Sequence, residues 1–235
     1  MEGGMNGMSP RISSSSSSFP SSKYRGGSRT STRTRTRTIN LIAFVVLALG
    51  CFSGLAQTNA TDDRTPRVRL ETSLGNIVVQ LDATAAPITV SNFLRYVDHH
   101  FYDGGSFFRT VTPANQPTNK VKIEVIQAEA NPARERESFA PIPLERTRDT
   151  KLRHRDGTLS MARDGPDTAQ SSFSICVDDQ PELDFGGKRN PDGQGFAAFG
   201  NVVEGMDVVR KIHDAPANGQ RLTPSIRIVH AVRIN

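Results

Sequence analysis

Short runs of alternating apolar and polar residues begin at Val68 and continue to the end of the chain. Alternation with a period of two residues is typical of a strand that buries one face. The runs at 68–72 and 76–82 are separated by Ser-Leu-Gly, and this arrangement predicts a β-hairpin. Further strands are predicted at 106–111, 122–129, 157–162, 172–178, 196–203 and 225–234.

Two segments change to the period of an α-helix. The first begins at Pro87, and proline suits the first helical position because that position needs no backbone N–H. Four apolar residues follow at helical spacing and form one face: Val90, Phe93, Leu94 and Val97. The second segment is 205–215, and its residues able to face one side are Met206, Val209 and Ile212.

Many short strands with only two helices favour a mainly-β fold, either an antiparallel barrel or a sandwich. We expect a closed barrel, because closing a sheet on itself removes its exposed edges. Closure requires the first and last strands to pair, and we expect the two helices to cover the barrel ends. Residues 130–156 are charged and contain proline, which predicts a long surface loop.

Residues 1–56 have the composition of a targeting segment. A stretch rich in serine and arginine is followed by an uncharged apolar run from Ile39 to Gly50. A basic region, an apolar run and small residues at a cleavage point are typical of a secretory signal. We therefore expect an export leader that is cut after Ala56, and a periplasmic or other extracytoplasmic location.

Other fates of the leader remain open. The apolar run could stay as an uncleaved anchor, although it is shorter than the roughly 20 residues of a usual membrane span. The sequence before Cys51 loosely matches a lipoprotein signal, and a lipid on Cys51 would hold the protein at a membrane. The composition also fits an organelle transit peptide. After the leader, residues 57–66 are predicted to be a linker and residues 67–235 one domain.

The net charge of +5 first suggests a nucleic-acid partner. Residues 1–56 hold seven basic residues and one acidic residue, so they carry +6 and the rest of the chain carries −1. A nucleic-acid footprint requires basic residues clustered on the folded domain, and we therefore expect no nucleic-acid binding.

Cys176 is the only cysteine after the leader, and no metal-ligand spacing or cofactor motif is present. We expect a buried Cys176, no metal and no cofactor.

Arg109 lies in the apolar run from Phe107 to Thr110, and its guanidinium stays charged at any ordinary pH. Taken alone, it would be interpreted as a surface arginine on an edge strand. However, the blocks Val68–Val111, Gly157–Asp179 and Phe196–Ile212 resemble, in order and spacing, three blocks of the cyclophilins. Cyclophilins are peptidyl-prolyl cis–trans isomerases, and the resemblance is to their compact bacterial type. It covers the chain from Val68 to Asn235.

The resemblance implies a closed eight-stranded antiparallel β-barrel capped by two α-helices, with a peptide groove on its outer face. It implies an isomerase that accelerates X–Pro rotation in unfolded or proline-containing polypeptides and so assists protein folding. Arg109 matches the catalytic arginine. The substrate-binding residues that the resemblance implies are Gln127, Val125, Met161, Ala162, Phe173, Leu183, Phe196 and Phe199. Met161 and Ala162 match a stretch that pairs with the substrate backbone.

Several groove positions depart from the family pattern. Glu124 and Ser174 stand where the family has phenylalanines of the proline pocket, and Glu182 stands where it has a groove-facing aromatic residue. Because each aromatic side chain can bury about 150–250 Å², their loss would leave a thinner apolar slot. These departures support an alternative function, a cyclophilin-fold peptide-binding or chaperone module with weak or no catalysis.

Overall fold

The computed structural model describes residues 63–234. The predicted leader, its cleavage point after Ala56 and Cys51 lie outside this range. The strands are β1 (Arg67–Thr72), β2 (Gly75–Leu81), β3 (Ser106–Val111), β4 (Val125–Glu129), β5 (Thr158–Met161), β6 (Phe173–Cys176), β7 (Ala197–Glu204), β8 (Ala217–Asn218) and β9 (Arg221–Ile234).

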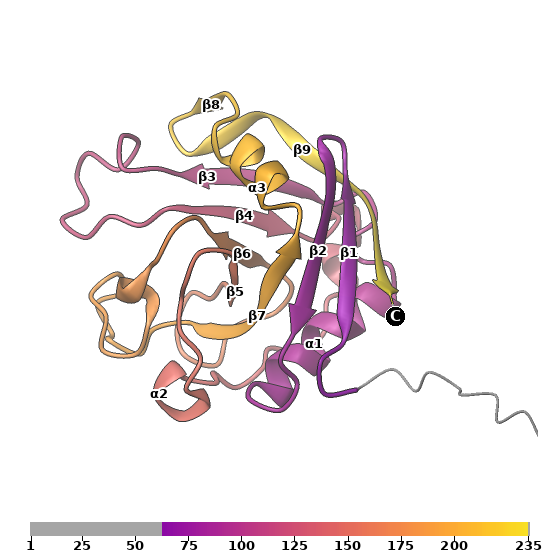
Figure 1. Ribbon diagram of the computed structural model, residues 1–235, viewed down its shortest axis with the longest axis horizontal. Helices are drawn as coiled ribbons and strands as arrows, with labels where there is room; N and C mark the ends of the chain where they lie inside the picture. The colour runs from indigo at the N-terminus through magenta and orange to yellow at the C-terminus, as the bar shows by residue number, and fades with distance from the viewer. Residues whose placement is uncertain (1–62, 235) are drawn as a thin grey trace, which may run out of the picture. The chain divides into compact units, whose positions relative to one another are not determined.

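These strands form one antiparallel sheet that closes into a barrel (Figure 1). Eight of them follow one another in the order β1-β2-β7-β5-β6-β4-β3-β9, and β9 pairs with β1 to complete the circle. The two-residue β8 only forms a short hairpin with β9. The predicted hairpin, the pairing of first and last strands and the closed eight-stranded barrel are confirmed.

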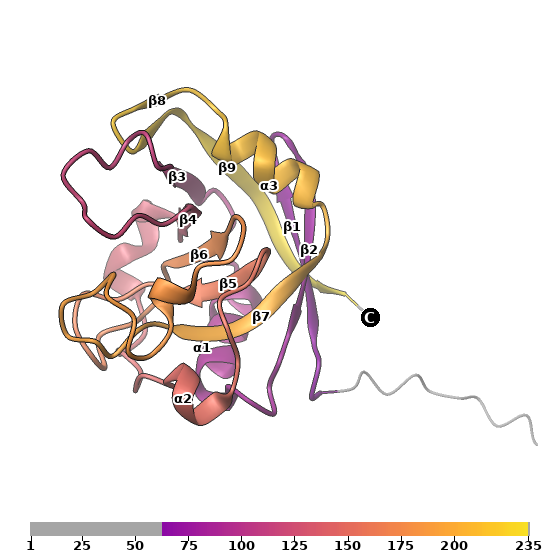
Figure 2. The ribbon, with the colours of Figure 1, turned by 60° about the vertical axis from the view of Figure 1, so that its left-hand side comes forward.

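Two helices cover opposite ends of the barrel, α1 (Pro87–Asp98) and α3 (Met206–His213), as Figures 1 and 2 show. The predicted apolar face of α1 is buried, with every one of its four residues at most 8% exposed. In α3, Val209 and Ile212 are fully buried and Met206 is partly buried. The predicted loop 130–156 is not wholly irregular, because it contains the short helices η1 (Pro132–Glu137) and α2 (Thr147–Thr150).

The alternation along β9 shifts phase within the strand. Ile226 and Ile228 are buried as the pattern indicates, but the next interior position belongs to Ala231 and not to Val232. The reason is a β-bulge against β1, where Glu71 pairs with His230 and Thr72 pairs with Ile228. Such a bulge adds one residue to one strand and moves all later side chains to the opposite face.

The barrel interior is filled with aromatic rings. Phe93 of α1 packs on Phe173 and Phe199, with ring centroids 5.2 and 5.4 Å apart. Tyr102 and Phe107 approach Phe173 at 5.5 and 6.2 Å. All five side chains are fully buried, and edge-to-face contacts of this kind add to the free energy gained from burial alone.

A second apolar cluster lies outside the barrel wall. On β3, β4 and β6, its residues alternate with side chains that point into the interior. We call it the outer cluster, and its members are Val111, Ile123, Val125, Cys176 and Leu183, with Phe196 packed against them. Cys176 is fully buried in this cluster, so the prediction that it is a buried apolar residue is confirmed, and its burial raises the pKa of its thiol.

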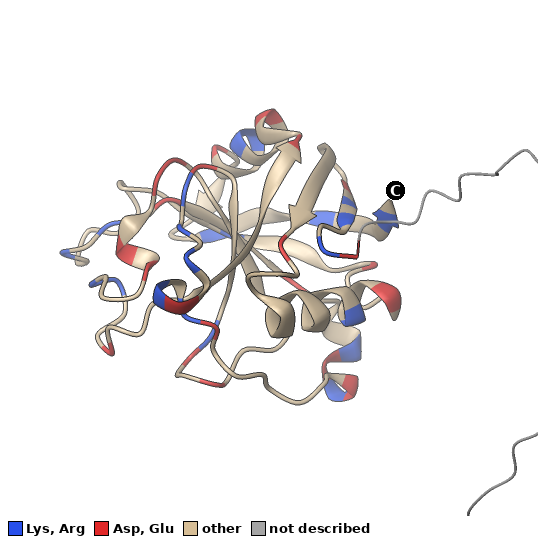
Figure 3. Cartoon of the chain, turned by 60° about the horizontal axis from the view of Figure 1, so that its bottom comes forward, with Lys and Arg blue, Asp and Glu red and all other residues tan. Residues whose placement is uncertain are grey.

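Acidic and basic residues are interspersed over the described domain (Figure 3). Among residues 63–234, no helix is both long and apolar enough to cross a membrane.

Candidate active site

A β-bulge in β3 places Arg109 on the outer face of the barrel. Phe107 pairs with Ala128 of β4 and Arg109 pairs with Gln127, so Phe108 is an extra residue between them. Without it, Phe107 and Arg109 would face the same side of the sheet. With it, Phe107 fills the interior while Arg109 points outward beside the outer cluster. Bulges often redirect a side chain in this way.

Two glutamine side chains hold the guanidinium of Arg109. Nη1 donates to Oε1 of Gln127 at 2.8 Å. Nε and Nη2 both donate to Oε1 of Gln220, at 2.9 and 2.5 Å. Gln127 is fixed in turn by its bond to Ser172, and Gln220 by its bond to the Asn115 carbonyl. Arg109 is therefore a donor whose position is set before any substrate arrives.

All three bonds of Arg109 end on neutral amide oxygens, so its charge is not cancelled by a carboxylate. Partial burial lowers the pKa of Arg109, yet a guanidinium remains protonated at physiological pH. A charge in a half-buried position acts more strongly on a nearby group than the same charge in water. This arrangement suits interaction with a substrate group that gains electron density.

Arg109 borders a cavity of about 140 Å³ whose floor is the outer cluster. Six of the predicted site residues line it: Arg109, Val125, Gln127, Ala162, Leu183 and Phe196. Five lining residues were not among the predicted site residues: Ile123, Ser160, Arg163, Ser174 and Arg189. The cavity therefore combines an apolar floor with fixed polar groups at its edge.

Two predicted groove aromatics are corrected. Phe173 and Phe199 are fully buried in the barrel interior, where both pack against Phe93. A peptide on the outer face cannot reach them, so they are core residues. The side chain of Met161 is also buried, at 1% exposure. Any contact between Met161 and a peptide would have to come from its backbone.

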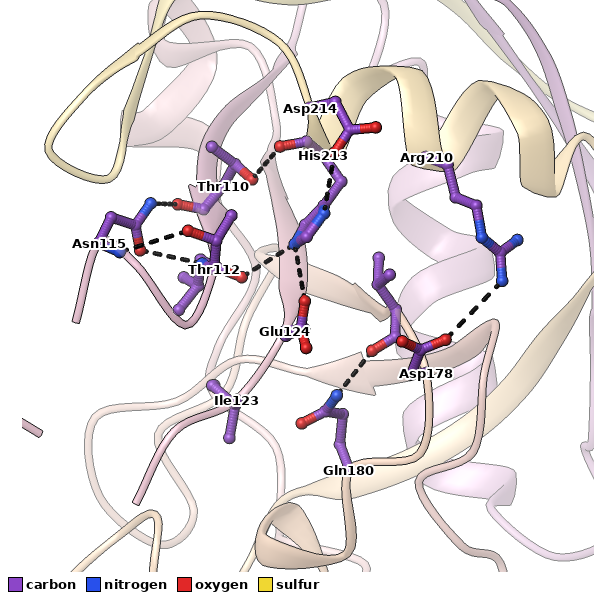
Figure 4. Close-up of polar contacts among 12 residues, drawn as sticks. Thr110, Thr112, Asn115, Ile123, Glu124, Asp178, Gln180, Arg210, His213 and Asp214 are labelled. Carbon is purple, nitrogen blue, oxygen red and sulfur yellow. Dashed lines mark hydrogen bonds and ion pairs between the residues drawn. The ribbon is translucent and has the colours of Figure 1, made fainter. Parts of the chain in front are cut away.

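Glu124 does not enter the cavity. Along this stretch the side chains of Ile123 and Val125 share the cavity face, so Glu124 between them takes the opposite face. Figure 4 shows its carboxylate directed at the ring of His213 in α3, with Oε2 3.9 Å from Nε2. The sequence-based placement of Glu124 in the proline pocket is therefore wrong.

Glu182 is not among the residues that line the cavity. It lies in η2 (Pro181–Leu183), and its carboxylate accepts a hydrogen bond from the backbone N–H of Lys188 at 2.7 Å. Its carbonyl accepts another from the N–H of Arg189. Glu182 therefore shapes the loop 184–196, and its carboxylate is engaged by the backbone of that loop. Ser174, in contrast, does line the cavity.

The loop 184–196 is fastened to the barrel from two sides. Arg163 forms a bidentate ion pair with Asp192, at 2.8 and 3.0 Å, and also donates to the Gly195 carbonyl. On the other side, Asp184 accepts a hydrogen bond from Nδ1 of the buried His154 at 2.8 Å, and Nε2 of His154 contacts Ser160 at 2.9 Å. These contacts fix Leu183 and Phe196 at the cavity.

Gln220, which holds Arg109, is one of the residues that the sequence analysis missed. It is 111 positions from Arg109 along the chain and directly precedes β9. No motif or periodicity marks a glutamine in a turn as the partner of an arginine on another strand. Only the pairing of β3 with β9 brings the two together.

A larger depression of about 460 Å³ lies elsewhere, bordered by residues of β2, β5 and β7 such as Gln80, Thr158 and Asn201. Its two arginines, Arg153 and Arg155, are paired with the carboxylates of Asp184 and Asp179, whereas Arg109 is held by neutral amides, so we assign the site to the smaller cavity. Among residues 63–234, no group of three or more His, Cys, Asp and Glu side chains is arranged to hold a metal ion.

Comparisons with known proteins agree with this geometry. Residues 67–233 match the family "Cyclophilin type peptidyl-prolyl cis-trans isomerase/CLD". The chain is 37% identical to peptidyl-prolyl cis-trans isomerase A of Dickeya dadantii over 169 residues, which cover 71% of this chain and 79% of the relative. It is 33% identical to peptidyl-prolyl cis-trans isomerase B of Escherichia coli over 146 residues, 62% of this chain and 82% of the relative.

Solved structures share the fold. A cyclophilin-type isomerase of Cryptosporidium parvum superposes with a TM-score of 0.59 at 20% identity, covering 73% of this chain and 98% of that one. The same protein in the presence of the dipeptide Ala-Pro gives a TM-score of 0.58, covering 72% and 99%. The chain therefore belongs to the cyclophilin-type family of proteins, and it is a peptidyl-prolyl cis–trans isomerase.

Proposed function

We propose that the domain isomerises X–Pro bonds of extended or unfolded polypeptides in the cavity beside Arg109, with Arg109 as the catalytic donor. The observation that carries this proposal is the pair of amide oxygens, from Gln127 and Gln220, that fixes the guanidinium above an apolar floor. Gln127 and Gln220 are positioning residues in this scheme. The proline ring packs on Val125, Leu183 and Phe196.

The chemistry needs no covalent intermediate. Resonance between the amide nitrogen and the carbonyl gives the peptide bond a rotational barrier of about 18–20 kcal/mol. As an X–Pro bond twists, the nitrogen lone pair leaves this resonance and becomes available as an acceptor. A fixed N–H of Arg109 then gains a hydrogen bond that the planar ground state cannot offer. Interactions that strengthen only in the transition state accelerate the reaction.

The binding-module alternative has lost most of its support. It depended on Glu124, Ser174 and Glu182 as departures inside the groove, but only Ser174 lines the cavity. Ser174 leaves the cavity wider than a phenylalanine at the same position would. The replacement of phenylalanine by serine takes away none of the polar groups that the proposed chemistry uses.

The location of the site can be tested by titrating ¹⁵N-labelled protein with the peptide Ala-Ala-Pro-Phe. We expect chemical-shift changes at Gln127, Ala162 and Phe196, together with faster exchange between the cis and trans peptide signals. Residues of the larger depression, such as Asn201 and Val203, serve as the internal control and should not shift. Shifts confined to that depression would contradict the proposal.

We also propose that the protein is exported and acts on extracytoplasmic polypeptides. The basic-then-apolar order of residues 1–56 and the small residues before Ala56 support export. Sequencing the N-terminus of protein from the extracytoplasmic fraction should give Gln57 as the first residue. A control chain that lacks residues 39–50 should stay in the cytosol.

Three other results would contradict cleavage after Ala56. Full-length protein in the membrane fraction would identify an uncleaved anchor. Membrane attachment that Cys51→Ser abolishes would identify a lipoprotein. An intact leader on cytosolic protein would contradict export itself.

A further inference from the structure

Arg189 is a second half-buried arginine at the cavity, and the proposed chemistry does not use it. It lies in the loop 184–196, of which the sequence analysis connected only Phe196 with the site. Its Nη1 donates to Oε1 of Gln116 at 2.7 Å and to the Val121 carbonyl at 2.9 Å. These two bonds join the loop after η2 to the loop between β3 and β4, which contributes Ile123 to the same cavity.

One edge of this guanidinium is free. Within residues 63–234, Nε and Nη2 of Arg189 have no hydrogen-bond partner, and Arg189 forms no ion pair. The hydrogens of Nε and Nη2 point the same way and form the fork that binds both oxygens of a carboxylate or phosphate. The bonds through Nη1 hold this fork at the cavity.

The charges at the cavity are unbalanced. Its described lining contains three guanidiniums, from Arg109, Arg163 and Arg189, and no carboxylate. Arg163 is neutralised by Asp192, but the hydrogen bonds of Arg109 and Arg189 all end on neutral oxygens. Burial, and then the positive charge of Arg109, lower the pKa of Arg189. The two arginines are therefore close enough to affect each other.

Three acidic side chains described above lie outside the cavity lining, and each is engaged by another group. The carboxylate of Glu182 accepts from the Lys188 backbone, and that of Glu124 faces His213. Asp184 is held by His154 and Arg153. An anion that enters the cavity would therefore meet two cations without first displacing a carboxylate.

We propose that Arg189 gives the isomerase a preference for prolyl segments that carry an anionic group, a carboxylate or a phosphate, beside the proline. This inference rests on the isomerase function and adds a specificity-determining residue to it. Arg109 binds the prolyl nitrogen, while the free edge of Arg189 pairs with the neighbouring anion. A lysine beside the proline is disfavoured, because it brings a third positive charge to the same cavity.

The preference can be measured as a ratio within each protein variant. The substrates are Ala-Glu-Pro-Phe, Ala-Ala-Pro-Phe and Ala-Lys-Pro-Phe, assayed with the full 235-residue chain for kcat/KM at low ionic strength. We expect kcat/KM for the Glu peptide to exceed that for the Lys peptide about tenfold, since one half-buried attraction replaces one repulsion. Raising the salt concentration should narrow the ratio, because ions screen the charges.

The variant Arg189→Gln should bring this ratio close to one. The ratio is independent of any general loss of activity from loosened loops, because both peptides are assayed on the same variant. Arg189→Lys, which keeps the charge but not the fork, should retain a smaller preference. The matched control is Lys188→Gln, which removes one positive charge from an exposed neighbour outside the cavity lining. It should keep the wild-type ratio.

Further peptides separate the possible sources of the anion. They carry glutamate after the proline, phosphoserine before it, or a free carboxylate on the proline itself. The proposal requires that wild type has a higher kcat/KM for at least one of the anionic peptides than for Ala-Ala-Pro-Phe. In Arg189→Gln this difference in kcat/KM must disappear. A wild-type enzyme with equal kcat/KM for all peptides would overturn the proposal. So would a preference that persists in Arg189→Gln, or one that Lys188→Gln removes equally. Absence of turnover with every peptide, Ala-Ala-Pro-Phe included, would instead contradict the proposed isomerase site.

Discussion

Replacing Arg109 with alanine is expected to reduce kcat/KM for prolyl peptides by roughly ten- to a hundredfold, because one charge-assisted hydrogen bond is worth about 1.5–3 kcal/mol. Peptide affinity should change much less, since the contact is made mainly in the twisted state. Arg109→Lys should also be poor. An ammonium on a flexible stem cannot bond to Gln127 and Gln220 together and still present a fixed planar donor.

The control for this experiment is Arg227→Ala. Arg227 is an exposed arginine on β9, paired with Ser106 of the same sheet but outside the cavity lining. It should retain wild-type kcat/KM. Far-UV circular dichroism and a melting curve establish that both variants are folded. A folded Arg109→Ala protein that isomerises peptides as fast as wild type would show that Arg109 is not the catalytic donor.

The barrel could be predicted from the sequence because burial on one face of a strand leaves a period of two residues. The period predicted each of the eight barrel strands to within a few residues. The period gave the wrong face after the β-bulges, because one extra residue turns all later side chains to the opposite face and nothing in the residue types indicates it. In β9 the period indicates that Val232 is buried, but Ala231 is buried in its place. In β3 the bulge at Phe108 is the reason that Arg109 points outward.

Comparison by blocks placed most of the cavity residues correctly but misplaced Glu124. A shift of one position along a strand moves a side chain to the opposite face, and Glu124 lies one position from both Ile123 and Val125 on the cavity face. Glu182 lies in a 3₁₀ turn, and the direction of its side chain depends on a hydrogen bond from the backbone of Lys188, which no pattern in the sequence indicates.

Several site residues that the sequence analysis missed come from distant parts of the chain. Gln220, Arg189 and Ser160 reach the site from a turn, a loop and a strand that are far apart in sequence. Each is a common polar residue whose neighbours in the chain look like those of any surface position. Their function depends on the tertiary positions of the loops around 116–123 and 184–196, which no local pattern encodes.

One of these loop contacts leads to the second large expected effect. Asp184 should be the acidic residue whose loss most destabilises the domain. Its side chain is nearly buried, and one oxygen accepts hydrogen bonds from both the backbone N–H and Nδ1 of His154, at 3.2 and 2.8 Å. Asp184→Ala leaves both donors buried without an acceptor. Each unsatisfied donor costs about 1–3 kcal/mol, so we expect the free energy of unfolding to fall by about 2–6 kcal/mol.

Urea unfolding of wild type and Asp184→Ala measures this loss, and Asp179→Ala is the control. Asp179 is an exposed neighbour paired with Arg155, and its removal should have a much smaller effect. Activity should fall together with stability in Asp184→Ala, because Leu183 and Phe196 depend on the same loop. An Asp184→Ala protein as stable as the control variant would mean that the solvent reaches His154 and satisfies it.

The same experiment has a defined pH dependence. Burial alone would raise the pKa of Asp184, but the hydrogen bonds from His154 and the nearby positive charge of Arg153 outweigh it and hold the pKa below its ordinary value. A carboxyl group with a lowered pKa in the folded state stabilises the protein above the unfolded pKa, which is about 3.9 for aspartate. That contribution is lost as the pH falls below this value toward the folded pKa.

The stability difference between wild type and Asp184→Ala should therefore be constant near neutral pH and shrink below about pH 4. A difference that grows on acidification would contradict the role of the ionised carboxylate.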